Sequence, residues 1–277
     1  MIDLHSHSTA SDGSLSPEDL LALAGEVGLQ HLALTDHDTI AGLEAATAAA
    51  NRHGINLIPG VELSVSWQKR TLHIVGLNID PDCPKLLSIL RTAADTRINR
   101  ARAIGASLEN AGIRGAFDGA RDIAGDDSNL SRSHFARFLV AQGHARNSQQ
   151  VFKRFMVGGK PGYVAAEWIA LADAVNVIHA AGGVAVLAHP SRYRVTAGKL
   201  RRIIADFRCA GGDAMEVCCG GSNPGEVSHL ARLARENQLC ASLGSDFHGP
   251  DKPWAKLGHL APIPTGIASV LDRIVSV

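Results

Sequence analysis

Two pairs of candidate metal ligands with alternate-residue spacing lie at opposite ends of this chain. His5 and His7 close an apolar segment at the N-terminus, and Asp246 and His248 follow an apolar run near the C-terminus. Because residues i and i+2 of an extended strand point the same way, the members of each pair can bind one ion. The pairs are more than 200 positions apart, so only a folded barrel or sheet can bring them together. The pattern therefore predicts a multinuclear metal centre.

Length and charge narrow the class of protein. The 277 residues suffice for one large α/β barrel or two smaller domains, and the 45% apolar content supports a true core. Basic and acidic side chains balance at 27 each. Because phosphate neutralisation favours a basic surface, this balance argues against a long nucleic-acid duplex as the main partner. It remains compatible with a local basic pocket for a small anion.

The cysteine and apolar patterns predict a cytoplasmic protein without a membrane anchor. The five cysteines show neither zinc-ribbon nor thioredoxin-like spacing, which indicates reduced, buried thiols. They are Cys83, Cys209, Cys218, Cys219 and Cys240. No apolar run approaches the roughly 20 residues of a membrane span. The opening sequence from Met1 to His5 leaves no room for a signal peptide.

Apolar runs rich in β-branched residues alternate with helical patterns. Such alternation is typical of parallel strands, and seven strands predict a β/α barrel with one unit fewer than the eight-fold form. In such barrels the chemistry gathers at the carboxyl ends of the strands, where the candidate ligands lie. The expected strands are Ile2–His5, Leu32–Thr35, Asn56–Glu62, Leu72–Leu77, Val184–Ala188, Ala214–Cys218 and Ala241–Gly244. The expected helices between them are Ser16–Val27, Ile40–His53, Asp173–Ala181, Gly198–Cys209 and Pro224–Asn237.

The alternation of strands and helices stops in the middle of the chain. Helical periods appear at Lys85–Asn110, Ser133–Gln142 and Ser148–Phe155, whereas Gly115–Asn129 is loop-like. We therefore expect a helical insertion at 85–163, lying as a cap over the mouth of a barrel formed by 1–84 and 164–277.

Further candidate ligands follow the expected strands. Glu62 closes an apolar strand, and a carboxylate that bridges two cations would offset the cost of burying it there. His37 lies between Asp36 and Asp38, and a carboxylate beside a ligating imidazole can orient the ring. Asp12 precedes a glycine, so it is either a turn residue or an oxygen ligand on the first loop.

Other polar residues are open to two interpretations. His73 lies inside an apolar strand, where a hydrogen-bonded core role is the default. His134 begins a helix, and the neighbouring Arg132 and Arg137 either line an anion site or simply lie in solvent. His189 follows a strand, as a catalytic or phosphate-contacting group would.

Together these residues resemble the PHP (polymerase and histidinol phosphatase) superfamily of metal-dependent phosphoesterases. Four motifs carry the resemblance, in order and over essentially the whole chain. They are Asp3-Leu4-His5-Ser6-His7, Thr35-Asp36-His37, Ala188-His189-Pro190 and Ser245-Asp246-Phe247-His248. The resemblance implies a distorted seven-stranded β/α barrel, which agrees with the strand count.

The resemblance also implies up to three divalent ions. The first would be held by His5, His7, Glu62 and Asp246, the second by Glu62, His73 and His134, and the third by Asp12, His37 and His248. Some family members carry histidine where this chain has Asp12. The extra carboxylate favours Mn²⁺, Fe²⁺ or Mg²⁺ over Zn²⁺, and we expect Mn²⁺.

Within the superfamily the chain looks most like the short, stand-alone branch. That branch removes the 3'-phosphate from nucleoside 3',5'-bisphosphates such as pAp, giving AMP and phosphate, and related members trim short oligonucleotides from the 5' end. Basic residues of the insertion suit such a doubly phosphorylated substrate. We expect substrate contacts from Arg97, Arg102, Arg132, His134, Arg137 and His189, while surface solvation is the alternative for the arginines.

The expected mechanism is hydrolysis by a hydroxide that bridges two cations. Glu62 and Asp246 would be catalytic through the ions they hold, and His189 would bind phosphate or protonate the leaving 3'-oxygen. The sequence has neither a nucleophile elbow nor a Walker loop.

Three alternatives stay open. Histidinol-phosphate phosphatase would use the same chemistry on a less anionic substrate. A non-catalytic, polymerase-associated PHP module would have lost ligands, yet all nine expected ones are present. An amidohydrolase-type enzyme would usually carry a lysine at a strand end, and the sequence shows none there.

Overall fold

The computed structural model describes residues 1–125, 130–251 and 255–274. The chain forms two compact units, one made of Met1–Ile89 with Ile169–Val277 and the other of Leu90–Trp168. The expected insertion at 85–163 overlaps the second unit. Its role as a cap remains a prediction.

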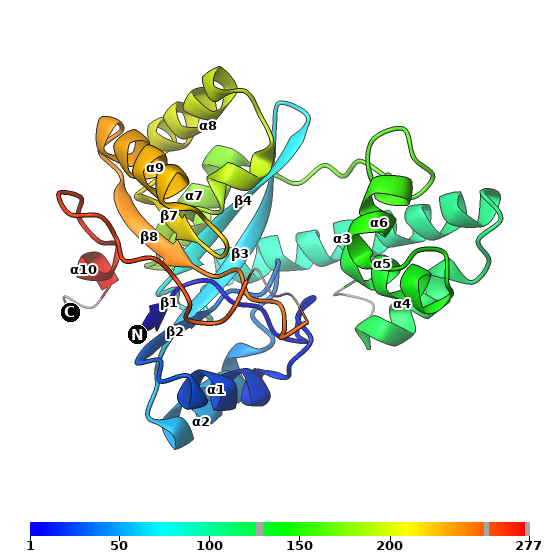
Figure 1. The fold of residues 1–277 in the computed structure, drawn as a ribbon, viewed down its shortest axis with the longest axis horizontal. Helices are drawn as coiled ribbons and strands as arrows, with labels where there is room; N and C mark the ends of the chain where they lie inside the picture. Colours follow the sequence, from blue (N-terminus) through cyan, green and yellow to red (C-terminus); the bar gives the residue numbers. More distant parts are fainter. Residues whose placement is uncertain (126–129, 252–254, 275–277) are drawn as a thin grey trace. The chain divides into compact units, whose positions relative to one another are not determined.

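The first unit is a nearly closed barrel (Figure 1). Its strands are β1 (Ile2–Asp3), β2 (His31–Leu34), β3 (Asn56–Trp67), β4 (Arg70–Leu77), β5 (Ile169–Ala170), β6 (Val184–Leu187), β7 (Ala214–Cys219) and β8 (Cys240–Gly244). The strands lie in the order β1-β2-β3-β4-β6-β7-β8, and β5 pairs with β3. The last strand meets the first, because the backbone N–H of Leu4 donates to the carbonyl of Leu243 over 3.1 Å. All seven predicted strands are confirmed.

The expectation of uniformly parallel strands is wrong at β4. This strand runs antiparallel to both β3 and β6, whereas β1–β2–β3 and β6–β7–β8 pair in parallel. The chain turns from β3 into β4 at Gln68 and Lys69, whose φ angles are 45° and 63°. A two-residue turn joins only antiparallel neighbours, since a parallel crossover needs a dozen or more residues.

Helices surround the barrel. They are α1 (Pro17–Glu26), α2 (Leu43–His53), α7 (Leu171–Ala180), α8 (Ala197–Cys209), α9 (Pro224–Glu236) and α10 (Leu271–Ile274), with a 3₁₀ turn at Pro190–Tyr193. In Figure 1, α1 and α2 lie beside β2, and α7, α8 and α9 lie on the side of β6 to β8. The helix α1 starts as its sequence predicts, because the Ser16 side chain accepts from the N–H of Asp19.

Two apolar clusters hold the barrel together. One joins α1 and α2 to β2 through buried residues such as Leu20, Leu32 and Ala46. The other includes Ala33 and Val186 from the parallel strands. Burying a leucine contributes about 1.5–3 kcal/mol. The strands are therefore held firmly enough to fix the loops that follow them.

The second unit is helical. It holds most of α3 (Pro84–Asn110), together with α4 (Ala116–Ala124), α5 (Arg132–Ala141), α6 (Ser148–Val151) and a π-helical turn at Phe152–Met156. The prediction of a loop over Gly115–Asn129 is wrong for α4, and residues 126–129 lie outside the described part. Gly119 lies against Phe138, where a side-chain carbon would collide with the ring. The glycine that hides the helical pattern thus permits close packing.

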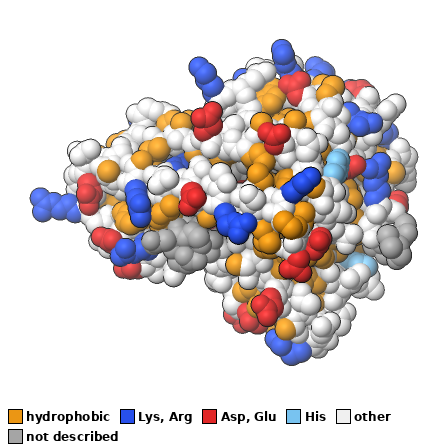
Figure 2. All heavy atoms as spheres, turned by 180° about the vertical axis from the view of Figure 1, so that it is seen from behind, with side chains coloured by type: hydrophobic (Ala, Val, Ile, Leu, Met, Phe, Trp, Pro, Cys, Tyr) orange, Lys and Arg blue, Asp and Glu red, His pale blue; other side chains and the backbone are white. Residues whose placement is uncertain are grey.

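The distribution of charged side chains and the apolar content of the helices agree with the composition. Figure 2 shows basic and acidic side chains interspersed on the face that it draws. Among the helices of the described residues, none is long and apolar enough to cross a membrane.

The close approach of β2, β3 and β4 makes a stability prediction at Gly60. A β-carbon there would lie 2.8 Å from Thr35 Cγ2 and 3.0 Å from the carbonyl oxygens of Leu34 and Gly76. We expect Gly60→Ala to lower the free energy of unfolding by about 1–3 kcal/mol. Urea denaturation monitored by circular dichroism measures this. Gly198→Ala is the matched control, because its β-carbon would have no neighbour within 4 Å. Equal unfolding midpoints for both variants would contradict the packing described.

Candidate metal centre

Eight of the nine predicted ligands come together at one end of the barrel. Three groups of side chains form there, and within each group the potential ligand atoms lie within 4.8 Å of one another. The groups are His5-His7-Glu62-Asp246, His37-Glu62-His73 and His7-Asp12-His37-His248. The side chains come from strands or from the loops that follow them, as expected for a barrel site.

The first group has the geometry of a cation site. His5 Nε2 and His7 Nε2 are 3.0 Å apart, and Glu62 Oε2 lies 3.2 Å and 3.3 Å from them. Asp246 Oδ1 is 3.1 Å from His7 Nε2. Adjacent ligands of an octahedral cation at about 2.1 Å are roughly 3 Å apart, so four donors at these separations fit one divalent ion.

Glu62 is shared between two groups. Its Oε2 also lies 2.9 Å from His37 Nδ1, and its Oε1 lies 2.9 Å from His73 Nδ1. The carboxylate is fully buried. Glu62 Oε2 and His37 Nδ1 have no hydrogen-bond partner among the described residues. Buried polar atoms rarely lack partners, and a bridging cation would satisfy both.

The third group is larger than the prediction. His248 Nε2 lies 3.1 Å from Asp12 Oδ1, and His37 Nε2 lies 3.9 Å from the same oxygen. His7 joins them, and so belongs to two groups, as His37 does. The family resemblance implied a single ion for each of these histidines.

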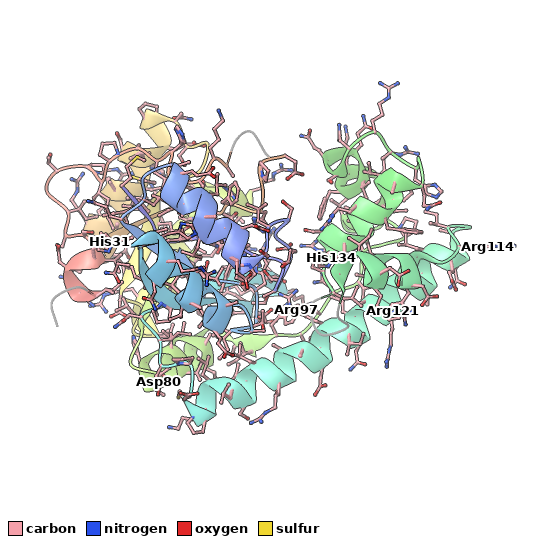
Figure 3. All side chains as sticks on the ribbon, turned by 90° about the horizontal axis from the view of Figure 1, so that it is seen from below. His31, Asp80, Arg97, Arg114, Arg121 and His134 are labelled. Carbon is pink, nitrogen blue, oxygen red and sulfur yellow. The ribbon has the colours of Figure 1, made fainter. Side chains whose placement is uncertain are left out.

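The ninth predicted ligand, His134, belongs to the second unit. Figure 3 labels it on α5, with Arg97 on α3 of the same unit. Its Nδ1 accepts from the backbone N–H of Ser131 over 3.1 Å, which completes a capping box at the start of α5. A metal role for His134 therefore stays a prediction.

Outer contacts orient three of the imidazoles. His5 Nδ1 lies 2.7 Å from Glu216 Oε1, and His248 Nδ1 lies 2.9 Å from the carbonyl of Asp246. His7 Nδ1 is 3.5 Å from Ser11 Oγ. Each of these partners can accept a proton from Nδ1, which leaves the Nε2 lone pair facing the cluster.

The carboxylates beside His37 bind neighbouring loops. Asp36 accepts from the N–H of Ser8 over 2.8 Å, from the Ser8 hydroxyl over 2.7 Å and from the Ser11 hydroxyl over 2.6 Å. Asp38 accepts from the N–H of Ser64 over 2.7 Å. These contacts tie together the loops that carry the ligands.

The electrostatics keep the carboxylates ionised. Burial alone would raise the pKa of Glu62, but His37, His5 and His73 outweigh it and hold the pKa well below its usual value. The pKa of Asp246 is likewise low, because His248 and His5 outweigh its burial. Burial lowers the pKa of His73 to about 4, which gives the neutral imidazole that metal binding needs.

His189 lies against the same cluster. Its Nε2 is 3.0 Å from Glu62 Oε1, and its backbone N–H donates to Glu216 Oε2 over 2.6 Å. The φ angle of His189 is 29°, a conformation that a non-glycine residue adopts only under constraint. Its catalytic role stays a prediction, and its placement suits that role.

Two further residues contact the cluster and were not predicted. Arg192 donates from Nη1 to Asp246 Oδ2, and from Nη2 to the carbonyl of Gly220 over 3.2 Å. Glu216 is buried in β7. A carboxylate inside an apolar strand was the signal for Glu62, and the same signal was present at Glu216. Arg192 had only its closeness to His189 in the chain.

The expected substrate arginines of the second unit fall into two sets. Arg97 is buried with its guanidinium 5.4 Å from the Trp168 ring centre, and Arg100 lies 5.9 Å from the same ring. Burial, then Arg132 and Arg97, lower the pKa of Arg100 to about 10, so these three cations lie close together. Arg102 and Arg137 are exposed.

Metal binding should stabilise the protein measurably. Mn²⁺ at about 100 times its dissociation constant adds about 2.7 kcal/mol, which raises the melting temperature by roughly 5–10 °C. Differential scanning fluorimetry against a chelator-treated sample measures the shift. Asp246→Asn should lose most of it, whereas Asp95→Asn, which removes an exposed carboxylate of α3, should keep it. An equal shift in both variants would exclude Asp246 as a ligand.

Two relatives match this chain over nearly its whole length. The chain is 48% identical to a 5'-3' exoribonuclease of Haemophilus influenzae over 271 residues, covering 98% of each chain. It is 46% identical to a 3',5'-nucleoside bisphosphate phosphatase of Chromobacterium violaceum over 263 residues, covering 95% of this chain and 92% of the relative.

Solved structures agree as well. One is described as an amidohydrolase from Chromobacterium violaceum with bound sulfate and no metal; it is 44% identical, with a TM-score of 0.95 over 99% of this chain and 96% of that one. A putative metal-dependent phosphoesterase from Bifidobacterium adolescentis is 25% identical, with a TM-score of 0.82 over 99% and 95% of the two chains. The PHP domain description matches residues 3–151. The chain therefore belongs to the PHP domain family.

Proposed function

We propose that this protein is a metal-dependent phosphohydrolase that cleaves the phosphate ester on the ribose 3'-oxygen of 5'-phosphorylated nucleotides. A nucleoside 3',5'-bisphosphate such as pAp would give a 5'-mononucleotide and phosphate. A short 5'-phosphorylated oligonucleotide would lose its terminal nucleotide by cleavage of the equivalent bond.

The sharing of Glu62 between two ligand groups carries this proposal. A carboxylate that faces two donor sets is suited to hold two cations side by side. Two-metal sites are typical of phosphoester hydrolysis, where the ions activate water and neutralise charge on the phosphoryl oxygens. A divalent metal centre fits the donor set, and we propose Mn²⁺ because three carboxylates join the imidazoles.

The activities named for the two relatives can act on the same kind of bond. One relative is named a bisphosphate phosphatase and the other a 5'-3' exoribonuclease. A 3'-phosphate monoester and the first phosphodiester of an RNA chain are both esters of a ribose 3'-oxygen. A single site can therefore serve both reactions, and only the group attached to the far side of the phosphorus differs.

Side chains of the barrel would do the remaining work. The bond between His189 Nε2 and Glu62 orients the ring, and His189 Nδ1 has no hydrogen-bond partner among the described residues. In its imidazolium form, His189 can give the proton on Nδ1 to the leaving 3'-oxygen. Arg192 keeps further N–H groups beyond those bound to Asp246 and Gly220, and these can bind a phosphoryl oxygen.

We also propose that the second unit contributes to anion recognition. Arg97 and Arg132, with Arg100 beside them, form a concentration of positive charge suited to the second phosphate of the substrate. A role for His134, Arg102 and Arg137 remains part of this proposal. The expectation of buried thiols is wrong at Cys209, which is exposed, while the other four cysteines are buried. All five are free, which favours a reducing, cytoplasmic setting.

A panel of substrates tests the proposed function. With Mn²⁺ present, we expect kcat/KM on pAp or a 5'-phosphorylated diribonucleotide to exceed that on histidinol phosphate by about tenfold to 100-fold, because the less anionic substrate lacks one phosphate contact worth about 1.5–3 kcal/mol. Phosphate release and chromatography of the products measure the rates. Preferred cleavage of histidinol phosphate, or of an amide instead of a phosphate ester, would contradict the proposal.

The arginine group makes a separate prediction. Arg132→Ala should raise KM for pAp by about tenfold to 100-fold with a smaller change in kcat, because it removes a charge-assisted contact made before the reaction. Arg121→Ala is the control, since Arg121 is exposed and pairs with Asp118 on α4. Steady-state kinetics on pAp compare the two. An unchanged KM in Arg132→Ala would exclude this residue from substrate binding.

A further inference from the structure

Glu216 is a buried carboxylate that belongs to none of the three ligand groups. It lies on β7 in the apolar run from Ala214 to Val217, with 1% of its surface exposed. An ionised carboxylate in such a place is costly unless strong hydrogen bonds compensate it. The position therefore needs an explanation beyond packing.

Both oxygens of Glu216 bind residues of the site. Oε1 lies 2.7 Å from His5 Nδ1, and Oε2 accepts from the backbone N–H of His189 over 2.6 Å. These are short distances, typical of hydrogen bonds to an ionised acceptor. One carboxylate thus connects a residue after β1 with a residue after β6.

The neighbouring backbone is shaped to admit this carboxylate. The register of β7 against β8 shifts between Glu216 and Cys218, as at a β-bulge, which re-aims side chains. Gly244 on β8 lies beside the contact. A β-carbon there would be 2.8 Å from Glu216 Oε1 and would collide with His5 Cβ.

We infer that Glu216 is a positioning residue with two tasks, which rests on the function proposed above. By accepting a hydrogen bond from Nδ1 of His5, it leaves the Nε2 lone pair of that imidazole facing the point where the carboxylate oxygens of Glu62 and Asp246 converge. By accepting from the N–H of His189, it holds that residue at its φ of 29° and thereby fixes the ring proposed above as the proton donor.

Glutamine cannot perform both tasks. Its side chain has nearly the same shape but offers one acceptor oxygen and one NH₂ donor. If the oxygen faces His189, the NH₂ faces His5 and forces Nδ1 to accept, which moves the proton to Nε2. If the oxygen faces His5, the NH₂ opposes the N–H of His189. Glu216→Gln therefore disturbs the hydrogen bond to His5 or the one to His189, while the volume of the side chain stays nearly the same.

The test compares Glu216→Gln with Cys219→Ala. Cys219 Sγ lies 3.7 Å from Glu216 Oε2, so its removal alters the same buried surroundings but keeps both strong hydrogen bonds. Titration of the chelator-treated proteins with Mn²⁺ gives affinity and stoichiometry without any substrate. We expect tenfold to 100-fold weaker binding in Glu216→Gln and wild-type binding in Cys219→Ala. Wild-type binding in both would overturn the task assigned at His5.

Kinetics at saturating Mn²⁺ test the second task. We expect kcat of Glu216→Gln to stay at least about tenfold below wild type with little change in KM, because excess metal cannot restore the position of His189. Full recovery of kcat with added Mn²⁺ would overturn that half of the inference.

A measurement on the unaltered sequence covers the case in which Glu216→Gln does not fold. Long-range ¹H–¹⁵N correlation spectra of the Zn²⁺-loaded protein report which ring nitrogen of His5 carries the proton, with the resonance assigned by its loss in His5→Asn. A protonated Nδ1 supports the inference, and a protonated Nε2 overturns it. A protein whose metal binding depends on Glu216 but which cleaves no phosphate ester would support this inference and contradict the proposed function.

Discussion

The structure depends on a negative charge buried among imidazoles. The Glu62 carboxylate is fully buried, and ring nitrogens of His5, His7 and His37 lie within 3.3 Å of its Oε2. Water does not reach the carboxylate, so its charge must be balanced by cations or by protons on the surrounding rings. Its pKa is held low by His37, His5 and His73, so it stays an acceptor and not a donor. A divalent ion satisfies this arrangement better than protons do, because several lone pairs then share one charge.

The barrel places this carboxylate where the two ends of the chain meet. Asp3 links them, because its Oδ1 accepts from the N–H of Ser245 over 2.8 Å and its Oδ2 from the N–H of Gly258 over 2.9 Å. The buried contacts of Asp36 then tie the first loop to the second. Polar groups outside the ligand groups thus set where the ligands can lie. The same reasoning leads to Glu216, which joins the first strand of the barrel to its sixth and seventh.

The sequence predicted much of the fold and most of the donor set for identifiable physical reasons. The strands are apolar runs with polar residues at their ends, so both the strands and the candidate ligands after them could be located. The strand β4 was predicted, but its antiparallel direction was missed because its turn, Gln68-Lys69, has no glycine or asparagine to mark it. The helix α4 was missed because Gly119 interrupts its apolar pattern, although Phe138 requires a residue without a side chain there.

The remaining features depend on three-dimensional contacts. The sharing of His7 and His37 between groups follows from how three loops converge, which spacing along the chain does not specify. Glu216 and Arg192 act through partners that lie 211 and 54 positions away in the sequence.

Crystals of the protein soaked with Mn²⁺ and measured at the manganese absorption edge test the central claim most directly. The account predicts anomalous density within bonding distance of both oxygens of Glu62, with His5 Nε2 among the ligands of one ion. Density absent from Glu62, or a carboxylate that contacts only protonated histidines under saturating Mn²⁺, would contradict it.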